Sequence, residues 1–531
     1  MENNNNPKID VINSHANDTP VKEPDIGNFV IGETLKQRCK IALSYERRDA
    51  YFEMESFCTD FSLHGKVGIV YGMRNTGKTI ILHQLAGRED YVMDSAYLTL
   101  RYKQCDIQKI YEWIENLRMI GIKYIFIDEI TWADGFIDFS APLADDWGTE
   151  DGVKIVLSGT DSLAFSWAGN SALYHRFVRT RTTWMSFPEY HRIKGGDIIK
   201  YIRNGGVFWE KNVPAQNRLE TYLKTSVVDN IYNTIRNTNK GVVDAELLMG
   251  FTKEDMYVLC YAICESLTIE YVMSKAHEVW GQKFAYGLKA ALSDCRIRLT
   301  KDAHDKIVNE SGEFQTDNVV FNKNQITLVI DILRQIGFLT TVPFYLGASY
   351  DDTAALIFTQ PGVACEFINN VVRSVRSNLD IVEAEKVVVK LNENTDGFLL
   401  ESVTLLTCLR TVMYLDQNDE TRISVGKFRQ LGGNHEKIDI VRYHYADKHL
   451  QLMEVKHSET SKSDFCKHLV NDAVVNYLMK RFGAETVERI LLYRGENKVI
   501  KTKGITVQCR NISEFLLESE FVIKTEDAVF S

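Results

Sequence analysis

The sequence predicts an α/β protein with three consecutive regions. Short β-branched and aromatic runs alternate with helical patterns over residues 29–197, which favours a doubly wound, mostly parallel sheet. Helical patterns then dominate residues 198–395, and the alternation of strands and helices returns over residues 396–531. A chain of 531 residues is also too long for one hydrophobic core, so several domains are expected.

Five strands and two longer helices are expected in the first region. The strand candidates are VGIVY (67–71), AYLTL (96–100), YIFID (124–128), KIVLSG (154–159) and RTRTTWM (179–185). Two intervening segments, TIILHQLAG (79–87) and IQKIYEWIENLRMIG (107–121), repeat apolar residues every three to four positions, as an amphipathic helix does.

The middle region is expected to be mostly helical, with a winged helix near residues 322–345. Its clearest helical runs are DMYVLCYAICESL (255–267) and QITLVIDILRQIGFL (325–339). The patterns of the last region predict a helix over 399–415, a hairpin near 438–456, a helix over 464–482, and the strands RILLYRG (489–495) and ITVQC (505–509).

Composition and charge narrow the class of protein. The net charge of −10 argues against a surface built for non-specific nucleic-acid binding, although a local basic groove is compatible with it. No stretch approaches the roughly 18 apolar residues of a membrane span. Residues 1–28 are expected to be a disordered N-terminal segment, and they lack the pattern of a signal peptide. The ten cysteines are scattered without zinc spacing, which favours a reducing cytoplasm.

The segment GMRNTGKT has the residues of a phosphate-binding loop. Such a loop needs glycine so that backbone N–H groups can point inward, a lysine for the β- and γ-phosphates, and a hydroxyl for Mg²⁺. A strand precedes the segment and a helix follows it, so the positive end of the helix faces the phosphates. The expected nucleotide-binding residues are Gly72, Met73, Arg74, Asn75, Thr76, Gly77, Lys78 and Thr79, and Thr79 is also an expected metal ligand.

The run KYIFIDEIT ends a hydrophobic strand with two acidic residues. Asp128 is expected to enter the Mg²⁺ sphere beside the nucleotide, and Glu129 to orient or deprotonate the attacking water. Taken alone, the pair equally fits a solvated acidic turn at a strand end. Paired with the phosphate loop, it favours a nucleotide site.

Two further segments supply polar candidates. Ser158, Thr160 and Asp161 lie at the end of another strand, and that end borders the ligand crevice of a doubly wound sheet. Thr160 is the expected γ-phosphate sensor, with a helix N-cap role for Thr160 or Asp161 equally open. Arg176 is a candidate to stabilise charge on the γ-phosphate, in its own chain or in a neighbouring subunit.

These motifs resemble a broad family of prokaryotic, archaeal-type AAA ATPases. Its members run from a phosphate loop through an Asp-Glu strand and a Thr/Ser-Gly-Ser sensor to Gly-Arg and a Leu/Ser-Phe-x-Glu-Tyr/Phe stretch. The chain has GMRNTGKT, YIFIDEI, IVLSGTDS and HRFVRTRTTWMSFPEYHRI. It departs at His175, which replaces the glycine before Arg176 and weakens that assignment, and in its Ser-Gly-Thr sensor. The resemblance implies a P-loop hydrolase that binds ATP and Mg²⁺.

The resemblance continues beyond the ATPase motifs. YIRNGGVF and LKTSVVDNIYN look like the family's linker helices, while residues 240–345 match poorly. GFLLESVTLL, EKIDIV and LMEVK look like its C-terminal domain, which is related to PD-(D/E)XK nucleases. This implies Asp439 and Glu454 as metal ligands, Lys456 in the active-site position and Glu401 as the acid on the helix.

Spacing alone supports part of that second site. Glu454 and Lys456 are two residues apart on one expected strand, so they share a face. Asp439 joins them only if the hairpin loop has an even number of residues. Carboxylates hold Mg²⁺, and a lysine can position water or offset phosphate charge. Ordinary charges on a solvated hairpin are the alternative.

The sequence therefore predicts a Mg²⁺-dependent ATPase whose nucleotide state controls a nuclease-like C-terminal domain acting on nucleic acid. The alternatives are a non-cleaving signalling or assembly ATPase, whose C-terminal domain only binds a partner, and a nucleic-acid-binding regulator that uses a winged helix. We expect a cytoplasmic protein with ATP, nucleic acid and further copies of itself as partners, and no membrane.

Overall fold

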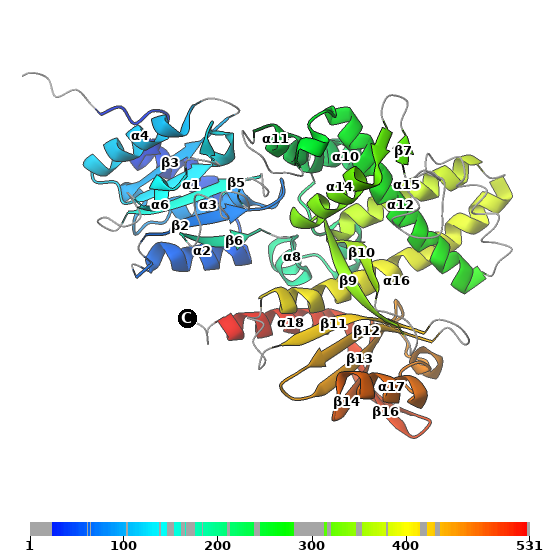
Figure 1. The fold of residues 1–531 in the computed structure, drawn as a ribbon. Coiled ribbons are helices and arrows are strands. Elements are labelled where there is room, and N and C mark those ends of the chain that lie inside the picture. Colours follow the sequence, from blue (N-terminus) through cyan, green and yellow to red (C-terminus); the bar gives the residue numbers. More distant parts are fainter. Residues whose placement is uncertain are drawn as a thin grey trace, which may run out of the picture.

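The structure, a computed structural model, contains two large sheets with helices around and between them (Figure 1). It describes residues 24–60, 62–63, 65–101, 105–136, 140–145, 153–160, 165, 176–182, 184–209, 213–237, 245–280, 313–315, 320–346, 353–378, 381–414, 422–430 and 436–527. Most of the expected disordered N-terminal segment, residues 1–23, lies outside these ranges.

The first sheet has six strands in the order β1-β3-β4-β5-β2-β6. The strands are β1 Val30–Ile31, β2 Val67–Tyr71, β3 Ser95–Thr99, β4 Tyr124–Asp128, β5 Lys154–Gly159 and β6 Phe177–Arg181. β1 is antiparallel to β3, and the other pairings are parallel. The prediction of a mixed α/β fold with a parallel sheet is confirmed.

One predicted strand, RTRTTWM, is wrong in its bounds. β6 begins at Phe177, which pairs with Val67, and ends at Arg181, which pairs with Tyr71. Beyond Arg181 the chain approaches the phosphate-binding segment: the Oγ1 atoms of Thr182 and Thr76 lie 2.8 Å apart, within hydrogen-bonding distance.

Helices cover both faces of this sheet (Figure 1). They are α1 Gly32–Leu43, α2 Asp49–Thr59, α3 Lys78–Ala86, α4 Ile107–Met119 and α6 Pro142–Asp145. Helix α8 Phe187–Lys194 follows β6 but lies apart from this sheet and packs against other helices (Figure 1). Side chains of a strand alternate between faces, so Ile69 of β2 joins one buried cluster, with Ile110 of α4. Val70 joins the other cluster, with Leu82 of α3.

The middle of the chain is rich in helices. They are α9 Ile198–Asn204, α10 Arg218–Tyr222, α11 Asp229–Asn237, α12 Lys253–Trp280, α14 Lys323–Gln335, α15 Pro361–Asn378 and α16 Ile381–Tyr414. A π-helical segment, Leu223–Val228, joins α10 to α11. The short strands β7 Glu313–Gln315 and β8 Val320–Asn322 form an antiparallel pair.

The second sheet has eight strands in the order β10-β9-β11-β12-β13-β14-β16-β15. The strands are β9 Leu339–Leu346, β10 Thr353–Phe358, β11 Ile423–Arg429, β12 Lys437–His444, β13 His449–Val455, β14 Thr486–Tyr493, β15 Lys498–Thr502 and β16 Ile505–Asn511. β9 pairs in parallel with β11, so β9 and β10 extend the C-terminal sheet. The expected boundary between residues 395 and 396 falls inside α16.

Helix α14 and strand β9 occupy the segment expected to form a winged helix. α14 begins with a capping box between Asn322 and Gln325. β9 pairs with β10 on one side and with β11 on the other. The hairpin after the helix is therefore part of a larger sheet and does not form a separate wing.

The C-terminal region contains the predicted hairpin as β12 and β13. His444 pairs with His449, so four residues connect the two strands. The predicted helix over 464–482 is interrupted: a 3₁₀ turn covers Ser463–Cys466, and α17 covers Asp472–Phe482. Asn471 accounts for the later start, because its side chain caps α17 by accepting a hydrogen bond from the N–H of Ala473. The last helix, α18, covers Ile512–Asp527.

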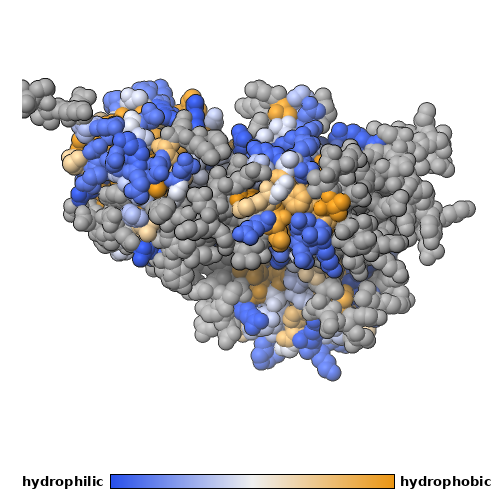
Figure 2. Space-filling view, turned by 45° about the horizontal axis from the view of Figure 1, so that its top comes forward, coloured by the Kyte–Doolittle hydropathy of each residue, from blue (hydrophilic) through white to orange (hydrophobic). Residues whose placement is uncertain are grey.

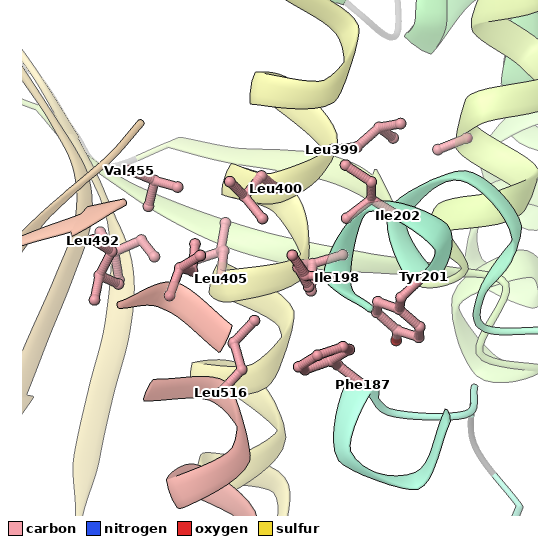
Figure 3. Close-up of a cluster of buried hydrophobic side chains, with 14 of the residues drawn as sticks. Phe187, Ile198, Tyr201, Ile202, Leu399, Leu400, Leu405, Val455, Leu492 and Leu516 are labelled. Atoms are coloured by element: carbon pink, nitrogen blue, oxygen red, sulfur yellow. The ribbon is translucent and has the colours of Figure 1, made fainter. Parts of the chain in front are cut away.

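One buried cluster joins α8 and α9 to the C-terminal part of the chain (Figure 3). Phe187 of α8 and Tyr201 of α9 approach α16 from one side. Leu400 of α16, Leu492 of β14 and Leu516 of α18 belong to the same cluster. The helix α16 therefore packs between α9 and the second sheet, and a single core spans what the sequence suggested were separate regions.

The helices and the surface of the described residues bear on the relation of the chain to a membrane. None of the described helices is both long and apolar enough to cross a bilayer. On the face in Figure 2, hydrophilic residues cover much of the coloured surface, and hydrophobic residues gather toward the centre of the view.

Leu400→Ala should destabilise the full chain. Leu400 is fully buried in the shared cluster, and truncating such a side chain costs about 2–5 kcal/mol. We expect a lower urea midpoint in an unfolding curve. Leu43→Ala is the control, because Leu43 is 41% exposed, and an equal shift in both variants would contradict the assignment.

Candidate functional site

The phosphate-binding segment connects β2 to α3 in a conformation that glycine permits. Gly72 has φ of 147°, and a Cβ atom there would lie 2.4 Å from the carbonyl oxygen of Thr182. Gly77 has φ of 89° and precedes the first residue of α3. Residues with side chains are strained in these conformations, so both glycines are needed for the path of the loop.

Lys78 points back into this loop. Its side chain is 5% exposed, and Nζ donates hydrogen bonds to the carbonyl oxygens of Gly72, at 2.9 Å, and Met73, at 2.8 Å. Burial lowers the pKa of Lys78. The loop thus encloses a cation at the N-terminus of a helix, where a phosphate-binding site requires one.

Thr79 and Asp128 meet as the sequence predicts. Thr79 Oγ1 donates to Asp128 Oδ2 at 2.7 Å, and Asp128 is 1% exposed. Tyr97 donates to the same carboxylate oxygen at 3.0 Å, and Ser158 donates to the other. Hydroxyl and carboxylate oxygens are the hard donors that Mg²⁺ prefers, so these residues fit that ion.

Glu129 is held by the strand-end threonine. Its backbone is left-handed, with φ of 59°. Thr160 donates to both carboxylate oxygens, from its backbone N at 3.1 Å and from Oγ1 at 2.7 Å. Asn230 of α11 in turn donates to the carbonyl oxygen of Thr160 at 2.8 Å. The predicted base and sensor therefore contact each other, and a helix of the middle region contacts the sensor. Asp161 lies outside the described residues.

A cavity of about 950 Å³ opens over these residues. Its walls include the segment between α1 and α2, the phosphate-binding loop with its acidic strand end, the end of α8, the π-helical segment and the start of α11. Lys78, Thr79, Glu129, Thr160 and Asn230 all line it. Small-molecule sites commonly have volumes of about 300–1,000 Å³, so the cavity has room for a nucleotide.

Arg48 and Glu189 form a buried ion pair beside the loop. The two guanidinium–carboxylate distances are 3.0 and 2.7 Å, and Glu189 is fully buried. Arg48 also donates to the carbonyl oxygen of Thr76 at 2.6 Å. The loop is thus fixed by a charged group from outside its own motif.

Arg176 lies away from this site. It immediately precedes β6, and its carbonyl oxygen accepts a hydrogen bond from Val67 at the start of β2. The phosphate-binding loop follows the other end of β2, about 15 Å further along the strands. The structure does not bring Arg176 to the loop of its own chain, which corrects that part of the prediction.

The second set of predicted residues meets on the β12–β13 hairpin. The four-residue connection is even, so the register of the pair sets Asp439 opposite Glu454. Lys456 Nζ lies 2.6 Å from Glu454 Oε2 and 3.5 Å from Asp439 Oδ2. Both carboxylates are buried, which disfavours the alternative of ordinary charges on a solvated hairpin.

Glu401 of α16 makes a different contact. Lys427 of β11 donates to its carboxylate. Within the described part of the chain, no group of three His, Cys, Asp or Glu side chains has the arrangement of a metal site. The structure therefore brings Asp439 and Glu454 together, and Glu401 is paired with Lys427.

The two paired carboxylates have opposite pKa shifts. Burial and the adjacent Asp439 raise the pKa of Glu454 to about 8. At Asp439, burial is outweighed by Lys456, Lys437 and Lys427, which hold its pKa well below the usual range. Glu454 Oε1 is buried without a hydrogen-bond partner. Such an oxygen suits a cation ligand, so the pair fits a divalent metal ion.

Several contributing residues carry no motif signal in the sequence. Tyr97 fits the ordinary alternation of side chains along β3, and the neighbouring sequence does not indicate that its hydroxyl reaches Asp128. Arg48 and Lys427 are basic residues whose partners are far away in the sequence. Glu189 stands in the SFPEY stretch, which was the available signal for it.

Residues 64–191 match the sequence model of the AAA domain family. The match begins just before β2 and ends within α8, so it covers the phosphate-binding loop, the acidic strand end and the sensor. It supports an AAA-type P-loop ATPase domain and nucleotide-binding ATPase activity. No curated protein matches the chain.

Thr160→Val should slow ATP hydrolysis and leave nucleotide binding nearly unchanged. The substitution removes the Oγ1 donor that orients Glu129. Because general bases contribute about 10²–10⁴-fold, we expect kcat to fall by about tenfold or more. Phosphate release and a nucleotide titration measure the two effects. Thr395→Val, a remote threonine that bonds only its own helix, is the control, and an unchanged kcat in Thr160→Val would contradict the role.

The raised pKa of Glu454 makes stability depend on pH. With a chelator present, the protonated carboxyl stabilises the folded state below its ordinary pKa near 4.5, and this stabilisation is lost as pH rises through about 8. Glu454→Gln stays neutral throughout. We expect the urea midpoint of the wild type to fall relative to this variant between pH 5 and 9, and a constant difference would contradict the shift.

Proposed function

We propose that the chain hydrolyses ATP with Mg²⁺ and that its nucleotide state controls a C-terminal nuclease-like domain acting on nucleic acid. The observation that carries the second half is the pair of buried carboxylates, Asp439 and Glu454, facing each other with Lys456 between them. Two carboxylates and a lysine at this spacing suit metal-dependent phosphodiester hydrolysis.

The first site supplies the groups that phosphoryl transfer to water needs. Lys78 leaves the loop carbonyls to bind the β- and γ-phosphates, and Thr79 and Asp128 hold the metal ion. Magnesium neutralises charge on the phosphates when bound. Glu129 orients the attacking water and accepts its proton, with Thr160 keeping the carboxylate in place.

The second site divides its tasks in the same way. Asp439 and Glu454 are the metal-binding groups, and the buried free oxygen of Glu454 is directed to that role. Lys456 offsets charge on the scissile phosphate and positions water beside it. Lys427 and Lys437 lie close enough to Asp439 to lower its pKa, so lysines gather around this site although the whole chain is acidic.

One observation favours the non-cleaving alternative. Glu401, the expected acid of the helix, is engaged by Lys427, and the described residues contain no three-carboxylate group. In that alternative the C-terminal domain binds a partner, and the ATPase acts in signalling or assembly.

A cleavage assay separates these functions. Purified protein is incubated with DNA or RNA, with Mg²⁺ or Mn²⁺, with and without ATP, as wild type, Lys78→Ala and Glu454→Ala. We expect metal-dependent cleavage that Glu454→Ala abolishes and that Lys78→Ala uncouples from ATP.

The matched control for Glu454→Ala is Glu485→Ala, an exposed acid of the same domain paired with Lys448. It should cleave like the wild type. ATP hydrolysis without any cleavage by the wild type would reject the nuclease and leave the non-cleaving ATPase.

A further inference from the structure

A chain of buried charged contacts leads away from the phosphate-binding loop. Arg48 is 6% exposed and uses its guanidinium in two directions. One nitrogen donates to the carbonyl oxygen of Thr76, inside the loop, at 2.6 Å. Two others bind the Glu189 carboxylate of α8. The position of the Thr76 carbonyl is therefore tied to the position of Glu189.

Glu189 is in turn tied to the start of α2. Its Oε1 accepts a hydrogen bond from the backbone N of Asp49 at 2.9 Å. Burial alone would raise the pKa of Glu189, but Arg48 and Arg410 outweigh it and hold the pKa at about 2. The carboxylate is therefore charged at neutral pH and needs every one of its donors.

Asp49 extends the contacts to the C-terminal part of the chain. Its Oδ2 accepts a hydrogen bond from Arg410 of α16 at 3.2 Å, and its Oδ1 accepts one from Arg192 of α8 at 2.8 Å. Arg410 is 7% exposed. It does not line the nucleotide cavity, and it lies on the helix that carries Glu401.

We propose that Arg410 positions the phosphate-binding loop through Asp49, Glu189 and Arg48, and that nucleotide binding and the C-terminal domain are coupled through these contacts. The proposal rests on the proposed function for its biological meaning, since it names the route by which nucleotide state reaches the second site. Arg410 is a positioning residue, since it touches neither nucleotide nor metal.

The charges of these residues and their burial explain why a movement of Arg410 is passed on to the phosphate-binding loop. A buried ion pair that loses one partner leaves an uncompensated charge, so a shift of α16 must be followed by Asp49, Glu189 and Arg48. Coupling between two sites is reciprocal. If bound nucleotide changes the position of α16, then a change in α16 must change the affinity for nucleotide. That change in affinity can be measured by nucleotide binding alone.

Arg410→Met should therefore weaken nucleotide binding from outside the cavity. Allosteric coupling typically amounts to about 5–150-fold in affinity, and we expect the Kd for ADP, followed by fluorescence titration, to rise at least about fivefold. We expect kcat for ATP to stay within about twofold, because Lys78, Thr79 and Glu129 are untouched. A merely structural role would lower the active fraction and leave Kd unchanged.

A second readout follows the signal in the other direction. Hydrogen–deuterium exchange of residues 437–456 is measured with and without ADP. We expect nucleotide to change exchange there in the wild type and to leave it unchanged in Arg410→Met. Arg334→Met, an exposed arginine of α14 paired with Asp331, is the matched control and should behave as the wild type in both measurements.

Wild-type Kd and a wild-type exchange response in Arg410→Met would overturn the proposal, as would an equal loss in Arg334→Met. If Arg410→Met does not fold, Asp49→Asn decides by the same criteria, because it keeps the backbone bond to Glu189 and removes the charge that Arg410 meets. Absence of nuclease activity in the wild type rejects the proposed cleavage and leaves this test valid, since neither readout requires cleavage.

Discussion

The arrangement of the chain depends on one carboxylate that is buried without any exposure. Glu189 carries a negative charge inside the protein, and such a charge is tolerated only when several donors surround it. The donors are Arg48 and the backbone N–H groups of Asp49 and Ser186. Arg48 and Asp49 stand at the start of α2, and Glu189 stands on α8, so satisfying one group fixes where the phosphate-binding loop, the edge of the first sheet and α16 meet.

The local part of the nucleotide site was predictable. The loop, its lysine and the acidic strand end are contiguous in the sequence, and strand periodicity placed Thr79 and Asp128 at the same edge of a parallel sheet. Tyr97 and Arg48 were not predictable, because their roles arise only when distant segments pack together. Arg176 was not brought to the loop of its own chain for a related reason: its segment was interpreted by motif order, and the register of β6 against β2 places it at the opposite end of the sheet. A role for Arg176 in a neighbouring subunit stays a prediction.

The second site shows which question the sequence left open. Whether Asp439 lies on the same face as Glu454 depended on whether the hairpin loop has an even number of residues. Four residues separate His444 from His449, and this places Asp439 opposite Glu454. Glu401 was placed correctly on a helix, but its ion pair with Lys427 involves β11, a strand that the patterns did not indicate. The sequence patterns did not indicate that β9 and β10 extend the second sheet, because β9 pairs with β11 some eighty residues later and such pairing leaves no mark on local periodicity.

The length of α16 has an evolutionary consequence. With 34 residues it is about 50 Å long, and it packs on α9 with one face and on the second sheet with another. A recombination event that exchanged only the residues after α16 would leave apolar side chains of α16, and those of α8 that meet α18, without their partners. The C-terminal part of this chain is therefore expected to be inherited together with the ATPase part, and new specificities to arise by substitution within it.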